Sequence, residues 1–258
     1  DQLINFYRER AIGGAGMISV GYATVDELAG NVGNIGAHDD TFIPGLRALA
    51  DAIRTGGAGS AVQLNHAGRY NSSFLLGGKK PMAPSAVPCR MTRETPREMG
   101  PEDIVDVIDR FADAAGRVKA AGFDMVEILA GTGYLISEFL SPLTNKRQDR
   151  YGGSRENRMR YPLEVFEAMR AVWPADKPLG VRVSAIDWVD GGLELEDTIA
   201  FAKALEARDC DFIHVSSGGL VPAEFPIGPG YQVDLAAAVK KETTMPVMAV
   251  GMIDNARQ

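Results

Sequence analysis

Short apolar segments rich in β-branched residues alternate along the chain with longer segments whose apolar positions recur at helical spacing. The apolar segments predict buried strands over residues 17–25, 60–64, 125–129, 179–183, 212–215 and 247–250. The amphipathic segments predict helices over residues 2–11, 43–54, 104–120, 155–173, 195–207 and 233–241. Strands and helices that alternate in this way form a parallel sheet with right-handed crossovers.

Two of the helices begin with recognisable signals. Pro101 is followed by Glu102 and Asp103, and a helix accepts proline and favours acidic side chains in its first turn. Ser154 precedes Asn157 by three residues, the spacing at which a serine hydroxyl caps a helix. Both signals support the assignment of helices rather than long loops.

Two α/β architectures fit the alternation: an open doubly wound sheet and a TIM barrel of eight β/α units. A doubly wound sheet that binds a dinucleotide would carry GxGxxG after a strand, and no glycine cluster of this chain has that context. A closed barrel needs eight strands, whereas the pattern predicts six. We therefore expect a single domain over residues 1–258, a TIM barrel that lacks its first and eighth strands in this chain.

Composition and charge exclude several classes of function. The chain has 258 residues, 45% of them hydrophobic, and a formal net charge of -7. Because it has no run of basic residues, it is not expected to bind nucleic acid. Cys89 and Cys210 form no CxxC pair, so neither a disulfide framework nor a metal site is expected. No apolar segment is long enough to span a membrane, and we expect a cytoplasmic protein with a small-molecule partner, homo-oligomerisation being left open.

The segment from Gly131 to Ser154 follows the predicted strand at 125–129. It reads as a long polar loop, with Tyr134 close to the strand end and a charged, glycine-rich tail. Barrel enzymes keep their chemistry in loops that follow strands. The tail itself is expected to be structural, with Arg147, Asp149 and Arg150 cross-linking the loop.

The sequence resembles the Old Yellow Enzyme family, and most closely its 2,4-dienoyl-CoA reductase and 2-enoate reductase branch. The motifs that carry this resemblance are FYRERAIGGAGMIS, QLNHAGR at 63–69, GTGYLISEFLSPLTNKRQDRYGGSRENR at 131–158, GVRVSAIDW at 180–188, HVSSGGLVP at 214–222 and GPGYQV at 228–233. The resemblance implies a TIM barrel with FMN at its carboxyl-terminal mouth and NADH or NADPH as the reductant. Larger relatives also carry an iron-sulfur cluster and FAD, for which the only place in this protein would be a region after Gln258; the sequence is silent on that region.

Two side chains on predicted strands suit the pyrimidine edge of a flavin. A fixed cation stabilises the anionic reduced ring, and Arg182 in GVRVS is the candidate. Gln63, at the end of SAVQL, offers both a donor and an acceptor. The alternatives are a structural salt bridge for Arg182 and an ordinary hydrogen bond at the rim of the barrel for Gln63.

Phosphate groups bind where glycines let the backbone approach closely. Ser217, Gly218 and Gly219 follow one predicted strand, and Gly251 follows the last. The resemblance supports cofactor contacts at both places. Simple turn chemistry is the alternative.

The resemblance assigns Tyr134 as the proton donor, and a phenol can supply a proton to a carbon atom next to the one that receives hydride. His66 and Arg69, in the motif HAGR, are expected near the substrate. A structural role is the alternative for His66, and Arg69 could instead anchor its loop. His214 is expected to line the barrel, and His38 receives no role.

The chain departs from the family at the substrate site. Many members carry a His at the end of the strand before Tyr134 and a His or Asn three residues later, and this pair binds a carbonyl or phenolate oxygen. Here the two positions are Leu129 and Thr132, and Leu129 cannot donate a hydrogen bond. An apolar first position is a property of the dienoyl-CoA and enoate reductases, although their additional histidine has no counterpart in SSGGLVPAEFPIGPGY.

We therefore expect an FMN-dependent, NAD(P)H-driven reductase that acts on the activated C=C bond of an α,β-unsaturated carboxylate or acyl thioester. Two alternatives stay open. One is a flavin-dependent amine or N-methyl demethylase on the same barrel, which would use an aromatic cage or a carboxylate to bind a cation. The other is a non-catalytic flavin-binding fragment.

Overall fold

A computed structural model describes residues 2–30, 33–255 and 257. Its centre is a seven-stranded parallel sheet with the order β2-β1-β3-β6-β7-β8-β9. The strands are β1 (Met17–Thr24), β2 (Ile35–Gly36), β3 (Gly59–Asn65), β6 (Met125–Ala130), β7 (Leu179–Ser184), β8 (Phe212–Ser216) and β9 (Val247–Ala249). A separate two-stranded pair, β4 (Met82–Ala83) and β5 (Arg97–Glu98), lies in the connection that follows β3.

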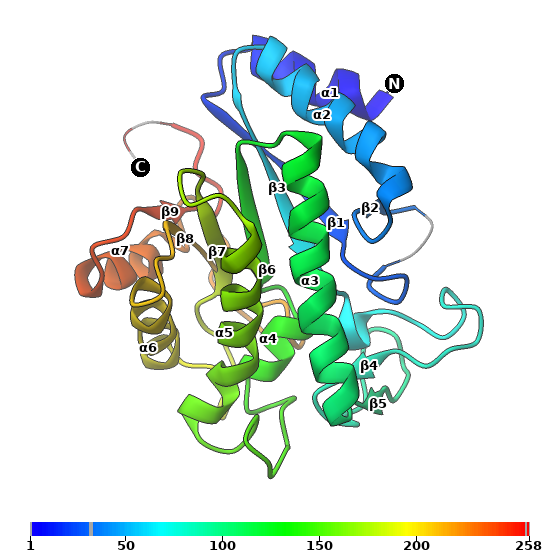
Figure 1. The fold of residues 1–258 in the computed structure, drawn as a ribbon. Helices are drawn as coiled ribbons and strands as arrows, with labels where there is room; N and C mark the ends of the chain where they lie inside the picture. Colours follow the sequence, from blue (N-terminus) through cyan, green and yellow to red (C-terminus); the bar gives the residue numbers. More distant parts are fainter. Residues whose placement is uncertain (1, 31–32, 256, 258) are drawn as a thin grey trace.

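Helices connect the strands and cover one face of the sheet. They are α1 (Gln2–Ile12), α2 (Ile43–Thr55), α3 (Pro101–Ala121), α4 (Leu135–Leu140), α5 (Arg155–Val172), α6 (Leu195–Glu206) and α7 (Val233–Glu242), with short 3-10 turns at Asp40–Phe42 and Gly68–Tyr70. In Figure 1, α3 and α5 lie in front of the central strands, with α1 and α2 at one side of the sheet and α6 and α7 at the other. The sheet curves as part of a barrel would, but within the described residues its edge strands β2 and β9 do not pair with each other.

The predicted α/β class and parallel topology are confirmed. All six predicted strands are present within one residue of their expected ends, as β1, β3, β6, β7, β8 and β9. The expectation that Gly131 to Ser154 is one polar loop is wrong in part, because α4 lies inside it and all its residues are buried. Leu135, Ile136, Phe139 and Leu140 are spaced so that they share one helical face, and this short pattern was overlooked.

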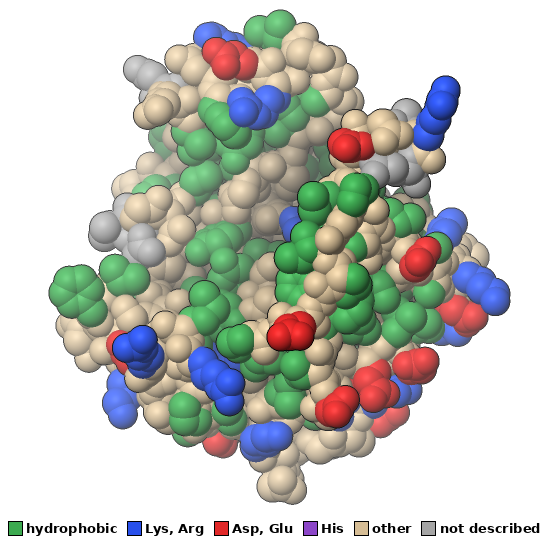
Figure 2. Space-filling view, turned by 180° about the vertical axis from the view of Figure 1, so that it is seen from behind, with side chains coloured by type: hydrophobic (Ala, Val, Ile, Leu, Met, Phe, Trp, Pro, Cys, Tyr) green, Lys and Arg blue, Asp and Glu red, His purple; other side chains and the backbone are tan. Residues whose placement is uncertain are grey.

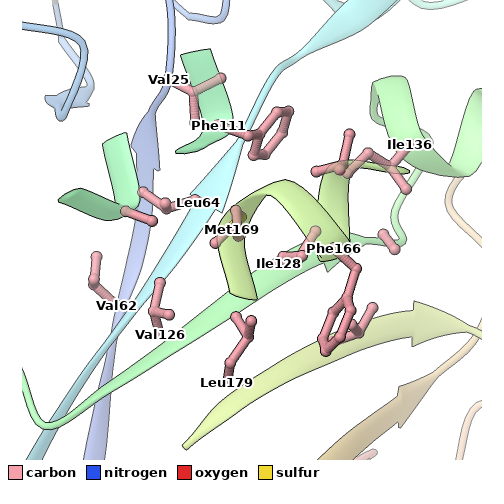
Figure 3. Packing of buried hydrophobic residues seen from close by; sticks show 14 of the residues in the cluster. Val25, Val62, Leu64, Phe111, Val126, Ile128, Ile136, Phe166, Met169 and Leu179 are labelled. Carbon is pink, nitrogen blue, oxygen red and sulfur yellow. The ribbon is translucent and has the colours of Figure 1, made fainter. Parts of the chain in front are cut away.

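The two faces of the sheet differ in chemistry. Alternate residues of each strand, such as Val62, Leu64, Val126 and Ile128, belong to the hydrophobic core between the sheet and the helices. Figure 3 shows these side chains packed against Phe111 of α3 and against Phe166 and Met169 of α5. Because side chains alternate along a strand, the residues between them point to the opposite, inner face of the sheet.

Local signals at the helix starts are confirmed. The Ser154 hydroxyl accepts a hydrogen bond from the backbone N–H of Asn157 at 3.3 Å. The Asp103 carboxylate accepts one from the backbone N–H of Gly100 at 2.7 Å, with Pro101 in the first turn. These contacts satisfy backbone donors that the first turn of a helix cannot pair internally.

The charged tail after α4 is held together by Arg147, as expected. The Arg147 guanidinium is buried and pairs with Asp149 at 2.5 Å. It also donates to the carbonyl oxygens of Pro84 at 2.9 Å and Met99 at 2.7 Å, while Arg150 pairs with Glu164 of α5 at 2.6 Å. The tail thus joins the connection that follows β3 to α5.

No helix in the described part of the chain is both long enough and apolar enough to cross a membrane.

Replacement of Phe111 by alanine is expected to destabilise the fold by about 3–5 kcal/mol, since it leaves a cavity between α3 and the sheet. Phe111 is fully buried, whereas Phe74 is 89% exposed. Phe74→Ala is therefore the matched control and should change the free energy of unfolding by less than about 0.5 kcal/mol. Urea titration followed by circular dichroism measures both, and equal effects would contradict this assignment of the core.

Candidate active site

The carboxyl ends of the parallel strands meet at one edge of the sheet, and the predicted site residues lie on the inner face or in loops at this edge. Figure 2 views the molecule from the side away from α3 and α5, and this side is hollowed at its centre. Apolar side chains border the hollow, and a basic side chain is visible inside it. The sheet thus presents a concave polar face opposite to its helix-covered face.

Arg182 lies on this inner face at the centre of β7. Its strand neighbours at the same level are Leu129 on β6 and His214 on β8. No hydrogen bond or salt bridge joins the Arg182 guanidinium to another described residue, and its Nε atom is buried without a partner. This geometry argues against a structural salt bridge as the reason for this arginine.

Gln63 lies on β3, directly opposite Glu127 of β6. Its amide nitrogen donates a hydrogen bond to a carboxylate oxygen of Glu127. No described residue donates to its amide oxygen, and this oxygen is not among the buried atoms without a partner. The side chain therefore presents an acceptor to the space in front of the inner face.

The loops after β6, β7 and β8 interlock at the edge of the sheet. The Ser184 hydroxyl accepts a hydrogen bond from the backbone N–H of Thr132 at 3.0 Å and donates one to the carbonyl oxygen of Gly218 at 2.7 Å. A Cβ atom at Gly219 would lie 2.8 Å from the Cα atom of Thr132. Only glycine permits this approach, so the two loops are fixed relative to each other.

Thr132 has a φ of 57° and Trp188 a φ of 61°. Left-handed backbone is unfavourable for a residue with a Cβ atom, and most of all for a β-branched one. Such strain is found mainly where the surrounding structure requires it, often at functional sites. The Oγ1 atom of Thr132 is buried and without a partner in the described residues, so it is a free hydrogen-bonding group next to Leu129.

Tyr134 lies between two other tyrosines that come from distant parts of the sequence. Its ring contacts Tyr22 of β1 edge to face at 5.3 Å between centroids and Tyr70 at 6.0 Å. The hydroxyl of Tyr70 donates in turn to the carbonyl oxygen of Gly219. Burial raises the pKa of Tyr134 to about 12, with the neighbouring Tyr22 hydroxyl adding to the shift, so the phenol stays protonated at neutral pH.

His66 is almost fully buried after β3. Its Nδ1 atom accepts a hydrogen bond from the backbone N–H of Gly68 at 3.0 Å, which places the proton of the neutral ring on Nε2. Burial lowers the pKa of His66 to about 4, opposed by the negative charge of Asp26. The Nε2 atom has no partner in the described residues, so His66 is a neutral donor rather than a cation.

Arg69 ties three loops together. Its backbone N–H donates to Glu138 of α4 at 2.9 Å, and its guanidinium donates to the carbonyl oxygen of Leu220 at 2.8 Å. A weaker contact reaches the carbonyl oxygen of Pro88 at 3.4 Å. Burial raises the pKa of Glu138 well above its usual range. These contacts favour the alternative in which Arg69 anchors its loop, next to a cavity of about 340 Å³ that Arg69 and Tyr70 help to line.

The candidate phosphate-binding residues lie together after β8 and β9. Gly218, Gly219 and Gly251 all have left-handed backbone, with φ values of 68°, 93° and 110°. The backbone N–H of Gly218 already donates to the carbonyl oxygen of Ile186 at 2.8 Å, and the Ser217 hydroxyl donates to Gln232 at 2.8 Å. Their role at a phosphate thus stays a prediction, and these two donors are occupied within the protein.

Most of the buried polar atoms that have no partner in the described chain gather at this site. They are Asn65 Nδ2, His66 Nε2, Thr132 Oγ1, Arg182 Nε, Trp188 Nε1 and His214 Nε2. Buried polar atoms are nearly always hydrogen-bonded in native proteins. Their concentration on one face marks a part of the protein whose polar groups the described residues do not satisfy.

Sequence reasoning missed Tyr22, Tyr70, Ser184 and Glu127. Glu127 lies on a predicted strand and Ser184 directly follows one, and each continues the alternation with the apolar residues, so both could have been found. Nothing in the sequence pairs Tyr22 or Tyr70 with Tyr134, since their contacts join loops that are far apart in the chain.

The two cysteines are both buried and unpaired. Within the described residues, no group of three or more His, Cys, Asp or Glu side chains could hold a metal ion.

Comparison with known proteins places this chain among flavin enzymes. The chain matches the NADH:flavin oxidoreductase / NADH oxidase family over residues 1–258. It is 45% identical to a metal reductase of Desulforamulus reducens, covering 98% of this chain and 38% of the relative. It is 43% identical to an NADPH dehydrogenase of a Geobacillus species, covering 98% of this chain and 73% of the relative.

The fold comparison gives a similar result. A solved complex of 2-naphthoyl-CoA reductase with 2-naphthoyl-CoA superposes with a TM-score of 0.92 at 35% identity, covering 98% of this chain and 41% of that one. The chain thus spans less than half the length of that reductase and of the metal reductase.

The lowered pKa of His66 predicts a loss of stability in acid. The folded protein binds this proton more weakly than the unfolded chain does. Neutral His66 therefore makes its full contribution to the free energy of unfolding above pH 6.5, and this contribution is lost as the pH falls toward about 4. The total loss is roughly 3 kcal/mol. In the variant His66→Asn, whose amide oxygen can still accept from Gly68, the free energy of unfolding should fall less over this range. His38→Asn serves as the control, and an unchanged acid dependence in His66→Asn would contradict the assignment.

Proposed function

The chain belongs to the NADH:flavin oxidoreductase / NADH oxidase family of FMN-dependent enzymes, and from this premise we propose that it reduces an activated C=C bond. The substrate class we propose is an α,β-unsaturated carboxylate or acyl thioester, with NADH or NADPH as the electron donor. One observation carries the proposal. A protonated phenol, Tyr134, follows β6 at the carboxyl edge of the sheet, and the cation Arg182, which has no partner among the described residues, lies on the inner face of the adjacent strand β7.

The inner face of the sheet suits FMN. Arg182 offers a guanidinium that no described residue neutralises, and a fixed positive charge favours the reduced, anionic form of a flavin. Gln63 offers an amide oxygen to an N–H group of the ring. We propose that the backbone around Gly219 and Gly251, where the chain bends through left-handed conformations, approaches the phosphate.

When bound and reduced by NADH or NADPH, FMN would supply a hydride for the β-carbon of the substrate. The protein must then hold the carbonyl oxygen and deliver a proton to the α-carbon. Thr132 Oγ1 and His66 Nε2 are buried donors without partners, and we propose that they hold that oxygen in place of the His pair of the wider family. Donors aimed at an oxygen on which charge develops are a large source of rate acceleration.

Tyr134 is the proposed source of the proton. Its pKa of about 12 keeps the hydroxyl protonated, and the rings of Tyr22 and Tyr70 fix its orientation. After the proton has been transferred to the α-carbon, the phenolate recovers a proton from solvent. The hydride and the proton together complete the reduction of the double bond.

The apolar Leu129 favours an acyl thioester or carboxylate over a simple enone. Leu129 is level with Arg182 on the inner face, so the substrate meets a hydrocarbon surface where other family members present a histidine. The similarity to 2-naphthoyl-CoA reductase supports a thioester. An iron-sulfur cluster or FAD, if the whole protein contains them, would be bound by residues outside this chain.

An amine or N-methyl demethylase is the second candidate, because Tyr22, Tyr70 and Tyr134 form an aromatic cluster at the site. A cage for a cationic amine needs ring faces that are open to the ligand. The rings of this cluster pack edge to face on one another instead, which makes the ene-reductase the better-supported proposal.

Activity measurements separate the two candidates. The purified protein is expected to be yellow, to be bleached by NADH or NADPH under anaerobic conditions, and to be reoxidised by crotonyl or dienoyl thioesters. Reduction by methylated amines in place of nicotinamide would instead support the demethylase. A protein that stays colourless after addition of FMN would overturn both.

Tyr134→Phe is expected to lower the rate of flavin reoxidation by an unsaturated thioester by roughly 100-fold or more, the usual contribution of a general acid. The rate of flavin reduction by NADPH should not change, because that step needs no proton from the phenol. Stopped-flow absorbance measures the two half-reactions separately. Tyr151→Phe, which removes a hydroxyl bonded to Glu164 at 2.9 Å in the structural tail, is the matched control.

The double variant Leu129→His, Thr132→His is expected to raise the ratio of kcat/KM for a cyclic enone to that for crotonyl thioester by at least about 10-fold, since it supplies two donors to a ketone oxygen. Histidine tolerates the left-handed backbone at residue 132 better than threonine does. Leu129→Met keeps an apolar side chain and should leave the ratio unchanged. If the double variant keeps the kcat/KM ratio of the parent protein, Leu129 and Thr132 do not determine the preference between enone and thioester.

A further inference from the structure

Glu127 is a buried carboxylate on the inner face that the proposed mechanism does not use. It is 2% exposed. One carboxylate oxygen accepts a hydrogen bond from the amide nitrogen of Gln63, and the other lies 3.0 Å from Nδ1 of His214. A buried carboxylate is costly unless both its oxygens are bonded, and here both are.

The three side chains come from three strands. Gln63 and Glu127 are direct neighbours on β3 and β6, whereas His214 lies on β8, beyond β7. The residue of β7 level with Glu127 is Gly180, where a Cβ atom would lie 2.3 Å from the ring of Phe212. The ring of Phe212 fills the space over Gly180. The Glu127 carboxylate meets His214 diagonally across β7, because His214 is level with Arg182, two residues further along that strand.

The contact with Glu127 fixes the orientation of the Gln63 amide. An ionised carboxylate only accepts hydrogen bonds, so the amide nitrogen of Gln63 must face Glu127, and the flipped amide would bring two oxygens together. The amide oxygen is left to face the ligand. A flavin carries an N–H group between two carbonyl groups on its pyrimidine edge, and a fixed acceptor at Gln63 matches that N–H.

The contact with His214 keeps Glu127 from neutralising Arg182. Arg182 is level with His214 and adjacent to β6, yet within the described residues no salt bridge joins Arg182 to Glu127, and the carboxylate pairs with the histidine instead. The guanidinium thereby stays available for an anionic ligand.

We propose that Glu127 is a positioning residue of the flavin site, which orients the amide of Gln63 toward the ring and is itself held by His214. This inference concerns cofactor binding and does not depend on the proposed substrate. It predicts that Glu127 affects the affinity for FMN through the amide of Gln63.

A double-mutant cycle tests this coupling. Apoprotein is titrated with FMN, and the dissociation constant is measured by quenching of flavin fluorescence. Glu127→Ala should weaken FMN binding by about 10-fold, the effect of one lost hydrogen bond, when Gln63 is present. In the background Gln63→Leu, which has no amide to orient, the same substitution should weaken binding by less than about 3-fold. If Glu127→Ala weakens FMN binding by the same factor with Gln63 present and in the background Gln63→Leu, the proposal is overturned.

Two further variants keep the test independent of folding defects. Asp124→Ala removes another carboxylate that joins β6 to β3. This carboxylate is bonded to the Ser60 hydroxyl at 2.7 Å at the opposite end of the strands, and its removal should leave FMN affinity unchanged.

Glu127→Gln keeps an acceptor for Gln63 and should retain FMN affinity within about 3-fold. Because it removes a negative charge, it should also shift the midpoint potential of bound FMN to a more positive value. An unchanged potential would show that no charge at Glu127 acts on the ring, and this outcome would also overturn the proposal.

Discussion

The site depends on the alternation of side chains along a parallel sheet that is covered by helices on one face only. The hydrophobic core between the sheet and helices α3 and α5 contains Val62, Leu64, Val126 and Ile128. The residues between them on the strands must therefore face inward. A shift of one residue would exchange the two sets of side chains and would place charges in the hydrophobic core. The packing of the outer face therefore fixes which side chains line the inner face.

On the inner face, the buried carboxylate has bonding partners, whereas the guanidinium has none among the described residues. Glu127 is bonded to Gln63 and His214, whereas Arg182 has no partner among the described residues. Arg182 is only partly buried, and a cation without a partner in the protein suits a ligand that carries or develops negative charge. The same arrangement explains the polar residues on strands whose other face is mainly apolar.

The loops at the edge of the sheet are held by close backbone contacts rather than by long side chains. Ser184 joins the loops after β6 and β8, and Gly219 lets one loop approach Thr132. The strained φ of Thr132 is stabilised by this contact. Tyr134 follows directly, so the rigidity of these loops determines where its hydroxyl lies.

The sequence by itself determined the strands, the helices and the chemical types at the site, because hydrophobic periodicity and short motifs are local properties. It placed Arg182 and Gln63 on strands and Tyr134 after one, and it identified Leu129 and Thr132 as departures from the family. It missed the buried helix α4, whose pattern is too short to stand out. Only the tertiary structure decided that Tyr22 and Tyr70 enclose Tyr134, that Arg69 anchors loops, and that Glu127 bonds to Gln63 and His214 rather than to Arg182. Those contacts join residues far apart in the chain, and their partners are set by strand register and burial, which no local pattern records.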